Sequence, residues 1–410
     1  MLRLAAVGAV DDGKSTLIGR LLHDTGQIPD DHLQAALLAS RRRGLDKIDL
    51  SLLTDGLQAE REQGITIDVA HRYLTIPGRK LIIADCPGHL QYTRNMATGS
   101  SNADIALVVI DITRGIRQQT KRHMVIASLF GIRRFIIAVN KMDAVSFSES
   151  HYDEIIGSLN ALQHDLKRVN LELGEVTAIP LSALTGDNVV SRSRHTSWYP
   201  GPTLLAALQE VRPRSEVKLP LRLPVQSVIR VGSTSRRYTG MISSGQIVDG
   251  QEVTILPSNV VTHIDGIWDA SGRVTMAGPL TSVSLELRDE VGITRGDMIA
   301  ESSAIPRVDD HFETILCWWS TRPASAGNKY LIKSGAKTTR ASIGKIETVL
   351  DMDAIQEMPA NELGHNAIGM STIETATPMP LDSYATNRAT GSFIIIDETT
   401  NATLGAGMVR

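Results

Sequence analysis

The sequence predicts an α/β domain built on a mostly parallel sheet, followed by two β-barrel domains. From Leu2 to about Val211, apolar runs of strand length alternate with segments of helical period, as in βαβ units. After Arg212, short alternating strands are separated by glycine turns, for example in residues 245–253. The 410 residues, 42% of them apolar, are enough to bury two or three separate cores.

The elements of the α/β domain follow in order along the chain. Residues 75–80, Thr-Ile-Pro-Gly-Arg-Lys, predict a hairpin turn, so the strand before this turn is expected to run antiparallel to the strand after it. The predicted strands are Leu2–Val7, Leu81–Asp85, Ile105–Asp111, Phe135–Asn140 and Val176–Leu181, and the predicted helices are Lys14–His23, Gln91–Thr98, Gln118–Phe130, Tyr152–Val169 and Thr203–Glu210.

Two breaks in the pattern predict the domain boundaries. Pro213, Pro220 and Pro224 interrupt a charged stretch that cannot continue a helix and is typical of a linker. A second break at residues 305–310, Ile-Pro-Arg-Val-Asp-Asp, divides the β-rich half in two. We therefore expect domains at residues 1–212, 221–304 and 310–410.

The composition limits the partners and the compartment. The chain has 42 Lys and Arg against 45 Asp and Glu, a net charge of −3, so no general attraction to nucleic acid is expected, although a local basic face stays open. Two cysteines, Cys86 and Cys317, are too few for a disulfide scaffold and lack zinc-site spacing. No apolar run approaches the ~20 residues of a membrane helix. We expect a soluble cytoplasmic protein.

A phosphate-binding pattern follows the first strand directly. Residues 8–15 fit G-x-x-x-x-G-K-[ST] and open a helix, where backbone N–H groups can wrap phosphate oxygens. Lys14 is expected to neutralise the β and γ phosphates and Ser15 to ligate Mg²⁺. The predicted nucleotide-binding residues here are Gly8, Ala9, Val10, Asp11, Asp12, Gly13, Lys14, Ser15 and Thr16.

A second motif predicts that the base is guanine. The Asp143 carboxylate, at the end of an apolar strand, can accept hydrogen bonds from N1–H and the 2-amino group of guanine, a donor pair that adenine lacks. The motif gains weight from its position at the strand ends where such sheets bind ligands. The base-binding residues are expected to be Asn140, Lys141, Met142 and Asp143, with the loop Ser182, Ala183 and Leu184 meeting guanine O6.

Between these motifs lie the residues expected to contact the γ phosphate. Asp85 can reach Mg²⁺ through water, and His89 is the predicted catalytic residue that orients the attacking water. Thr66, in the segment Gly64-Ile65-Thr66-Ile67, can ligate Mg²⁺ through its hydroxyl. Without the other motifs, Asp85 would be interpreted as a helix cap, His89 as a surface residue and Thr66 as an ordinary strand residue. The segment after the strand comprises Asp85, Cys86, Pro87, Gly88 and His89, of which Gly88 can offer its N–H to the γ phosphate.

Three further features have simpler interpretations. Cys86 is expected to be a buried strand-end hydrophobe, because no activating His and acid surround it. Arg41-Arg42-Arg43 predicts a solvated helix face, with a partner surface as the alternative. Trp318 and Trp319 are expected in one strand, pointing to opposite sides, one in the core and the other a candidate contact anchor.

Together these motifs resemble the translation-factor superfamily of GTPases, and within it the GTPase subunits (subunit 1, or large subunit) of bacterial sulfate adenylyltransferases. The resemblance spans nearly the whole chain. Elongation factors usually carry His where this chain has Asp12, and members of the subunit family usually carry Glu where this chain has Leu90. The sharpest matching segments are Val10–Asp24, Asp55–Ala70, Gln91–Gly99 and Gly186–Ser193.

The resemblance implies an elongation-factor-like fold and a regulatory subunit that binds GTP and Mg²⁺. It implies that GTP hydrolysis here is coupled to the formation of adenosine 5′-phosphosulfate and pyrophosphate from ATP and sulfate by a smaller catalytic subunit, in a heterodimer or higher assembly. This coupling has a physical reason, since making a phosphosulfate anhydride is steeply uphill. Neither membrane nor nucleic acid is an expected partner.

Two other functions remain open at this point. One is an elongation-factor-like GTPase that delivers aminoacyl-tRNA, and the other is a degenerate GTPase that serves only as a scaffold. A fused adenylylsulfate kinase, which some relatives carry, would require another phosphate-binding loop. Residues 334–338, Ser-Gly-Ala-Lys-Thr, lack the necessary Gly-Lys pair and are expected in a barrel strand.

Overall fold

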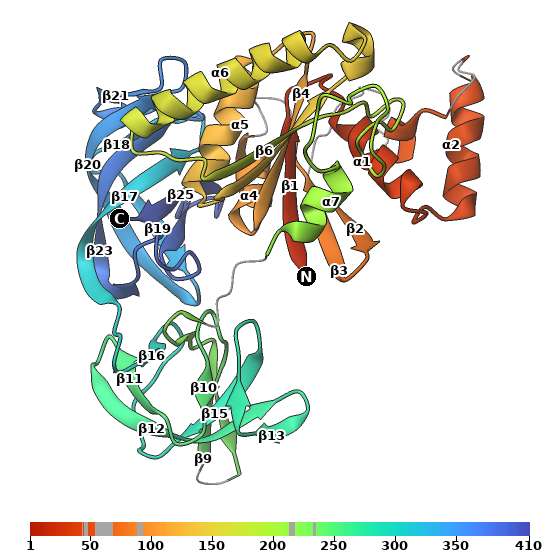
Figure 1. The fold of residues 1–410 in the computed structure, drawn as a ribbon. Coiled ribbons are helices and arrows are strands. Elements are labelled where there is room, and N and C mark those ends of the chain that lie inside the picture. Colours follow the sequence, from red (N-terminus) through yellow and green to blue (C-terminus); the bar gives the residue numbers. More distant parts are fainter. Residues whose placement is uncertain (43, 45–47, 54–68, 88–92, 213–217, 233–234) are drawn as a thin grey trace. The chain divides into compact units, whose positions relative to one another are not determined.

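The chain forms two compact units. The computed structural model describes residues 1–42, 44, 48–53, 69–87, 93–212, 218–232 and 235–410 (Figure 1). The first unit comprises Met1–Arg214 with Met352–Gln356, and the second comprises Ser215–Asp351 with Glu357–Arg410. The first is α/β, and in the second the described elements are strands.

A six-stranded sheet forms the centre of the first unit. Strand β2 runs antiparallel to β3, which confirms the hairpin predicted at residues 75–80, and the other pairs are parallel. In spatial order the strands are β2 (Ala70–Ile76), β3 (Arg79–Asp85), β1 (Leu2–Gly8), β4 (Ile105–Asp111), β5 (Arg134–Asn140) and β6 (Glu175–Pro180). The loop after β1 lies at the carboxyl edge of the sheet. Since β1 is between β3 and β4, this loop is flanked by the carboxyl ends of those two strands, where such sheets bind ligands.

Helices cover both faces of this sheet. Helices α1 and α7 pack on one face, and α4, α5 and α6 lie on the other (Figure 1). Helix α6 begins three residues before the predicted Tyr152, and the predicted helix start at Gln91 lies outside the described residues. The bounds are α1 (Lys14–Asp24), α2 (Asp30–Arg42), α4 (Thr93–Ser101), α5 (Gln118–Leu129), α6 (Glu149–Arg168) and α7 (Leu204–Glu210), with short 3₁₀ helices at Leu50–Leu53 and Met142–Val145.

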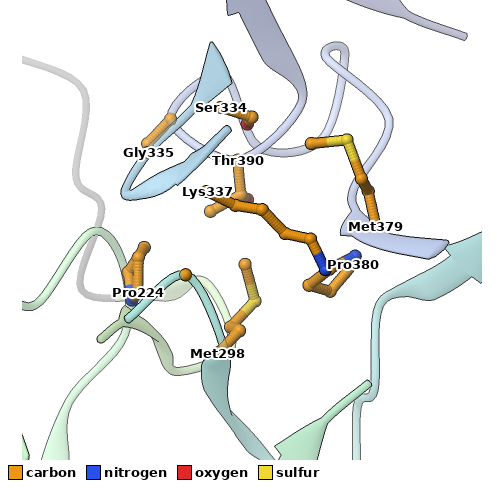
Figure 2. Close-up of a pocket in the computed structure, with 10 residues that line it drawn as sticks. Pro224, Met298, Ser334, Gly335, Lys337, Met379, Pro380 and Thr390 are labelled. Carbon is orange, nitrogen blue, oxygen red and sulfur yellow. The ribbon is translucent and has the colours of Figure 1, made fainter. Parts of the chain in front are cut away.

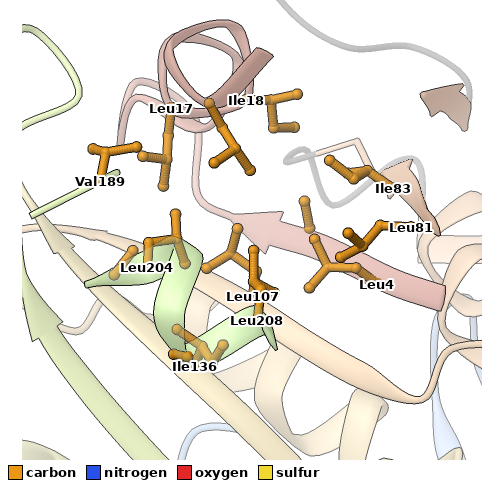
Figure 3. Close-up of a cluster of buried hydrophobic side chains, with 14 of the residues drawn as sticks. Leu4, Leu17, Ile18, Leu81, Ile83, Leu107, Ile136, Val189, Leu204 and Leu208 are labelled. Carbon is orange, nitrogen blue, oxygen red and sulfur yellow. The ribbon is translucent and has the colours of Figure 1, made fainter. Parts of the chain in front are cut away.

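One cluster of buried apolar side chains in the first unit lies between the sheet and the helices α1 and α7. Leu4 and Leu107 are fully buried in the sheet, where Leu4 pairs with Ile83 and Ile105 in register. Leu17 of α1 and Leu204 of α7 close over them (Figure 3). Alternation along each strand directs one set of side chains to these helices, as the period of two requires.

The solvated helix face predicted around Arg41 belongs to α2. Arg41 and Arg42 are exposed, and only Ala36 and Ser40 of this helix are buried. The prediction is therefore confirmed for these two arginines, and Arg43 lies outside the described residues.

The second unit begins with a barrel-like sheet around its own core. Leu223, Ile255 and Leu285 are among the buried residues of that core. The strands in spatial order are β7 (Arg222–Pro224), β16 (Met298–Glu301), β11 (Glu252–Leu256), β12 (Val260–Asp269), β15 (Ser282–Leu287), β9 (Ser235–Met241) and β8 (Ser227–Val231), with β13 (Gly272–Val274) paired to β12 and β10 (Ile247–Val248) paired to β14 (Met276–Ala277).

The rest of the second unit contains a closed ring of six strands. Strand β19 pairs with both β24 and β20, so the sheet closes on itself around Phe312, Ile343 and Phe393. Around the ring the strands are β19 (Lys329–Ser334), β24 (Ser392–Ile396), β25 (Thr403–Val409), β17 (Arg307–Trp318), β23 (Ile368–Leu381) and β20 (Lys337–Asp351), with β21 (Gln356–Pro359) beyond β20 and β18 (Ala324–Ser325) paired to β22 (Glu362–Leu363).

The two sequence predictions that fall on this ring need correction. Trp318 is buried, as predicted for one tryptophan of the pair, but β17 ends there, so Trp319 lies outside the strand and is half-buried. The last residue of β17 paired with β25 is Trp318, opposite Gly405, although the Trp319 N–H still donates to the Leu404 carbonyl oxygen at 2.8 Å. Residues 334–338 are not one strand, since Gly335 and Ala336 turn between β19 and β20.

Polar contacts join the two sheets of the second unit. The Arg222 guanidinium binds both carboxylate oxygens of Asp382, with Nε and one terminal nitrogen each 2.9 Å from an oxygen. Nearby, Pro224 and Met298 from one sheet and Lys337 and Met379 from the other line a small pocket (Figure 2).

Candidate functional site

The loop between β1 and α1 has the backbone of an anion-binding turn. Gly13 has φ 90°, and Asp11 also lies in the left-handed region with φ 66°. A Cβ on Gly13 would meet Asn140 Nδ2 at 2.4 Å, and one on Gly8 would meet the Val109 carbonyl oxygen at 2.9 Å. Both glycines are therefore sterically required. Because the residue before α1 is a glycine, no side chain caps the helix, and its positive end suits an anion.

Lys14 and Asp85, predicted to serve the phosphates and the metal, meet at this loop. The Lys14 Nζ contacts Asp85 Oδ1, and both side chains are almost fully buried. Ser15 is half-buried in the first turn of α1. The Ser15 hydroxyl and the Asp85 carboxylate are oxygen donors of the kind that Mg²⁺ prefers, so the residues fit that ion.

Cys86 and Pro87 close the strand end behind Asp85. Cys86 is fully buried, and burial raises the pKa of its thiol to about 12, which confirms the prediction of a strand-end hydrophobe. A Cβ on Gly99 of α4 would lie 2.4 Å from Cys86 Sγ, so this glycine lets the helix approach the strand end.

Asn140 joins two predicted nucleotide-binding loops, the phosphate loop of residues 8–16 and the base loop of residues 182–184. Its Nδ2 donates to the Asp12 carbonyl oxygen at 2.9 Å, and its Oδ1 accepts from Ala183 N at 2.9 Å. Asn140 is buried at the end of β5, so both hydrogen bonds are shielded from water. One side chain thus fixes the spacing between two loops that are far apart in the sequence, since Asn140 follows Asp12 by 128 residues and precedes Ala183 by 43.

The predicted base loops are held against each other. Ser182 Oγ donates to Asp143 Oδ1 at 2.5 Å, and Met142, fully buried, donates its N–H to the Leu181 carbonyl oxygen at 3.2 Å. Asp143 is half-buried and Leu184 is 64% exposed. The carboxylate that is expected to select guanine therefore has a fixed position and an open side.

Charged side chains surround Asp11 and Asp12 of the phosphate loop. Lys141 Nζ donates to the Asp11 carbonyl oxygen at 2.7 Å and to Asp111 Oδ2 at 2.8 Å. The Lys141 ammonium contributes to holding the pKa of Asp111 below its usual value, together with hydrogen bonds from Thr113. Lys141 thus anchors the loop rather than only continuing the base motif.

Two contacts of this region were not predicted from the sequence. Arg117 reaches Val10 and Asp12 of the phosphate loop, and Arg20 donates to the carbonyl oxygens of Ala183 and Leu184 at 3.0 and 2.6 Å. The sequence signal for Arg117 was Asp12 itself, because a carboxylate beside a predicted phosphate site requires a nearby cation. No feature of the sequence indicated the contacts of Arg20.

Helix α5 carries a buried histidine near the same loop. Burial, with smaller contributions from the Lys14 and Arg122 cations, lowers the pKa of His123 to about 3. His123 is 4% exposed. It is therefore neutral in the folded protein at physiological pH.

The residues expected to contact the γ phosphate are only partly described. Thr66, Gly88 and His89 lie outside the described residues, as does Leu90. Their roles stay predictions. In the part of the chain that the structure describes, no three His, Cys, Asp or Glu side chains form a metal-binding group, and no helix is long and apolar enough to cross a membrane.

Comparisons with known proteins agree with this arrangement. Residues 1–214 match the family model of the elongation factor Tu GTP binding domain, and residues 311–410 match that of the GTP-eEF1A C-terminal domain. Over the whole chain, the protein is 44% identical to sulfate adenylyltransferase subunit 1 of Yersinia enterocolitica and 43% identical to that of Alteromonas mediterranea, covering 86% of each relative. It is also 44% identical to the bifunctional enzyme CysN/CysC of Mycobacterium tuberculosis, of which it covers 67%.

Proposed function

The chain belongs to the elongation factor Tu-type GTP-binding proteins, and among them to the sulfate adenylyltransferase subunit 1 family of enzyme subunits, and from this premise we propose that it couples GTP hydrolysis to sulfate activation. A smaller catalytic subunit forms adenosine 5′-phosphosulfate and pyrophosphate from ATP and sulfate. The proposal rests chiefly on the 44% identity to a subunit 1 protein over the whole of this chain, together with the link that Asn140 makes between the two predicted nucleotide loops.

Each loop has a defined task in this proposal. The loop of residues 8–16 surrounds the phosphates, with Lys14 neutralising them, while Asp143 accepts hydrogen bonds from guanine and the 182–184 loop meets guanine O6. Asn140 keeps these two parts at one spacing. A Mg²⁺ ion held by Ser15, Asp85 and Thr66 would neutralise charge on the β and γ phosphates.

The segments around Thr66 and His89 provide the coupling in this proposal. Contacts to the γ phosphate order such segments, and hydrolysis releases them, so they can act on a partner subunit. His89 orients the attacking water. We further propose the three domains 1–212, 221–304 and 310–410, and a cytoplasmic location, which suits the unpaired thiols of Cys86 and Cys317.

The test is adenylylsulfate synthesis by the full chain with the smaller subunit that co-purifies with it. We expect synthesis from ATP and sulfate to increase with GTP, and Lys14→Ala to abolish this increase. Lys80→Ala removes the same charge from an exposed position of β3 and serves as the control. Synthesis that ignores GTP would reject the proposal, and salt-sensitive, GTP-dependent binding of aminoacyl-tRNA would favour a role in translation.

A further inference from the structure

Arg117 connects the start of α5 to the phosphate loop. It is the residue immediately before the helix, and its backbone is extended, with φ −81° and ψ 161°. One terminal nitrogen of its guanidinium lies 2.5 Å from the Val10 carbonyl oxygen and 2.5 Å from Asp12 Oδ1. A single cation therefore holds a main-chain acceptor and a side-chain acceptor of the loop together.

Asp12 is bound from both sides within the loop. Its Oδ2 accepts the Ala9 N–H at 3.0 Å, while Oδ1 accepts Arg117. The Asp12 side chain is fully buried. Burial raises the pKa of this carboxyl, and the Arg117 cation opposes that effect. The Asp12 carboxylate thus links the backbone at Ala9 to the guanidinium of Arg117 at the start of α5.

A buried carboxylate in this position is unfavourable without a cation. It repels the phosphates that the loop is proposed to bind, and an uncompensated buried charge destabilises the surrounding structure. Elongation factors, which the sequence resembles, usually carry His here. Arg117 is thus the counter-charge that an aspartate requires at this position.

Arg114, which lies between β4 and α5 as Arg117 does, provides a contrast. Its side chain is 45% exposed and lies 3.7 Å from Oδ2 of the exposed Asp11 and 3.7 Å from Oδ2 of the buried Asp111, beyond hydrogen-bond distance of either oxygen. Surface pairs such as Arg114 with Asp11 contribute little to stability. Arg114 carries the same charge as Arg117, but among the described residues it donates no side-chain hydrogen bond to the phosphate loop.

We propose that Arg117 is a positioning residue for nucleotide binding, which acts by pairing with Asp12 and fixing the Val10 carbonyl so that the loop is preorganised for the β phosphate. The inference rests on the proposed GTP-binding function. It assigns Arg117 no contact with the nucleotide itself. The effect of removing Arg117 should therefore depend on the charge of Asp12.

A double-mutant cycle on the full chain tests this dependence. Dissociation constants for GDP are measured by competition with a fluorescent guanine nucleotide for the wild type, Arg117→Met, Asp12→Asn, the double variant and Arg114→Met. Loss of a buried charge-assisted contact predicts about 10- to 100-fold weaker GDP binding in Arg117→Met. Arg114→Met should change binding by less than about threefold.

The double variant separates pairing from general charge. In the Asp12→Asn background no carboxylate is left unpaired and Arg117→Met removes only the contact with the Val10 carbonyl, so it should weaken GDP binding much less than it does in the wild-type background. Additive effects of the two substitutions, or equal losses in Arg117→Met and Arg114→Met, would overturn the inference. Should Arg117→Met fail to fold, the double variant is expected to fold, and its failure would also overturn the pairing.

The affinity for GMP distinguishes a role at the phosphate loop from a general structural role, which would weaken GMP and GDP binding equally. GMP lacks the β phosphate, so Arg117→Met should weaken GMP binding much less than GDP binding. Equal losses for both ligands would contradict a role in arranging the phosphate loop. A wild-type chain that binds no guanine nucleotide would instead refute the proposed function, which keeps the two failures distinct.

Discussion

The buried neutral His123 makes the stability of the first unit depend on pH. Its pKa is about 3 in the folded chain, against an ordinary value of 6.5. Between these two values the unfolded chain binds more protons than the folded chain, so stability falls as the pH falls below 6.5 and is fully present above it. At pH 5 the loss is about 1.36 × 1.5, or about 2 kcal/mol.

Urea unfolding of the wild type and His123→Gln at pH 7 and pH 5 measures this loss. The described helices lie in Met1–Arg214, so the helical circular dichroism signal reports on the first unit. The wild type should lose about 2 kcal/mol more than His123→Gln between the two pH values. His164→Gln, at a side chain that is 79% exposed, is the control and should lose as much as the wild type. Equal losses in wild type and His123→Gln would refute the reasoning.

Three further predictions concern other parts of the chain. Asp143→Asn should weaken GTP binding about 10- to 100-fold in calorimetry, because a charged acceptor for guanine is lost; unchanged affinity would mean that the base pocket is misplaced. Arg222→Met should lower the stability of the second unit by about 3–5 kcal/mol, since Asp382 is left as a nearly buried charge without its partner. Urea unfolding followed by tryptophan fluorescence measures this loss, and a loss below about 1 kcal/mol would contradict the prediction. Cys86 should resist iodoacetamide at pH 8 in the native chain and react in urea, because its thiol pKa is about 12; rapid native labelling in peptide mapping would argue against its burial.

The strands of the first unit could be predicted because their pattern is local. A fully buried run such as Ile105–Asp111 shows itself in composition alone, and its observed bounds equal the predicted ones. The hairpin before Arg79 was visible through Pro77-Gly78. Helix ends were less certain: α6 starts at Glu149 rather than Tyr152, because the polar residues of a first turn give no apolar period.

Long-range contacts set the limit of prediction for the site. The motifs predict a phosphate loop and a base loop, and Asn140 and Ala183, one from each side of the predicted base pocket, are hydrogen-bonded to each other. The contact of Arg117 with Asp12 depends on how two loops 105 residues apart meet, which no local pattern encodes. Likewise, the end of β17 at Trp318 depends on the pairing with β25, so Trp319 was wrongly placed in the strand.

The closed ring of the second unit makes its folding depend on the order of synthesis. Strand β25 lies between β24 and β17, so the ring cannot close until Thr403–Val409 have left the ribosome. Until then the largely apolar end of β17, Thr314–Trp318, keeps an unpaired edge, a template for association with other nascent chains. A stop codon before Thr403 should therefore yield aggregates rather than a shortened barrel.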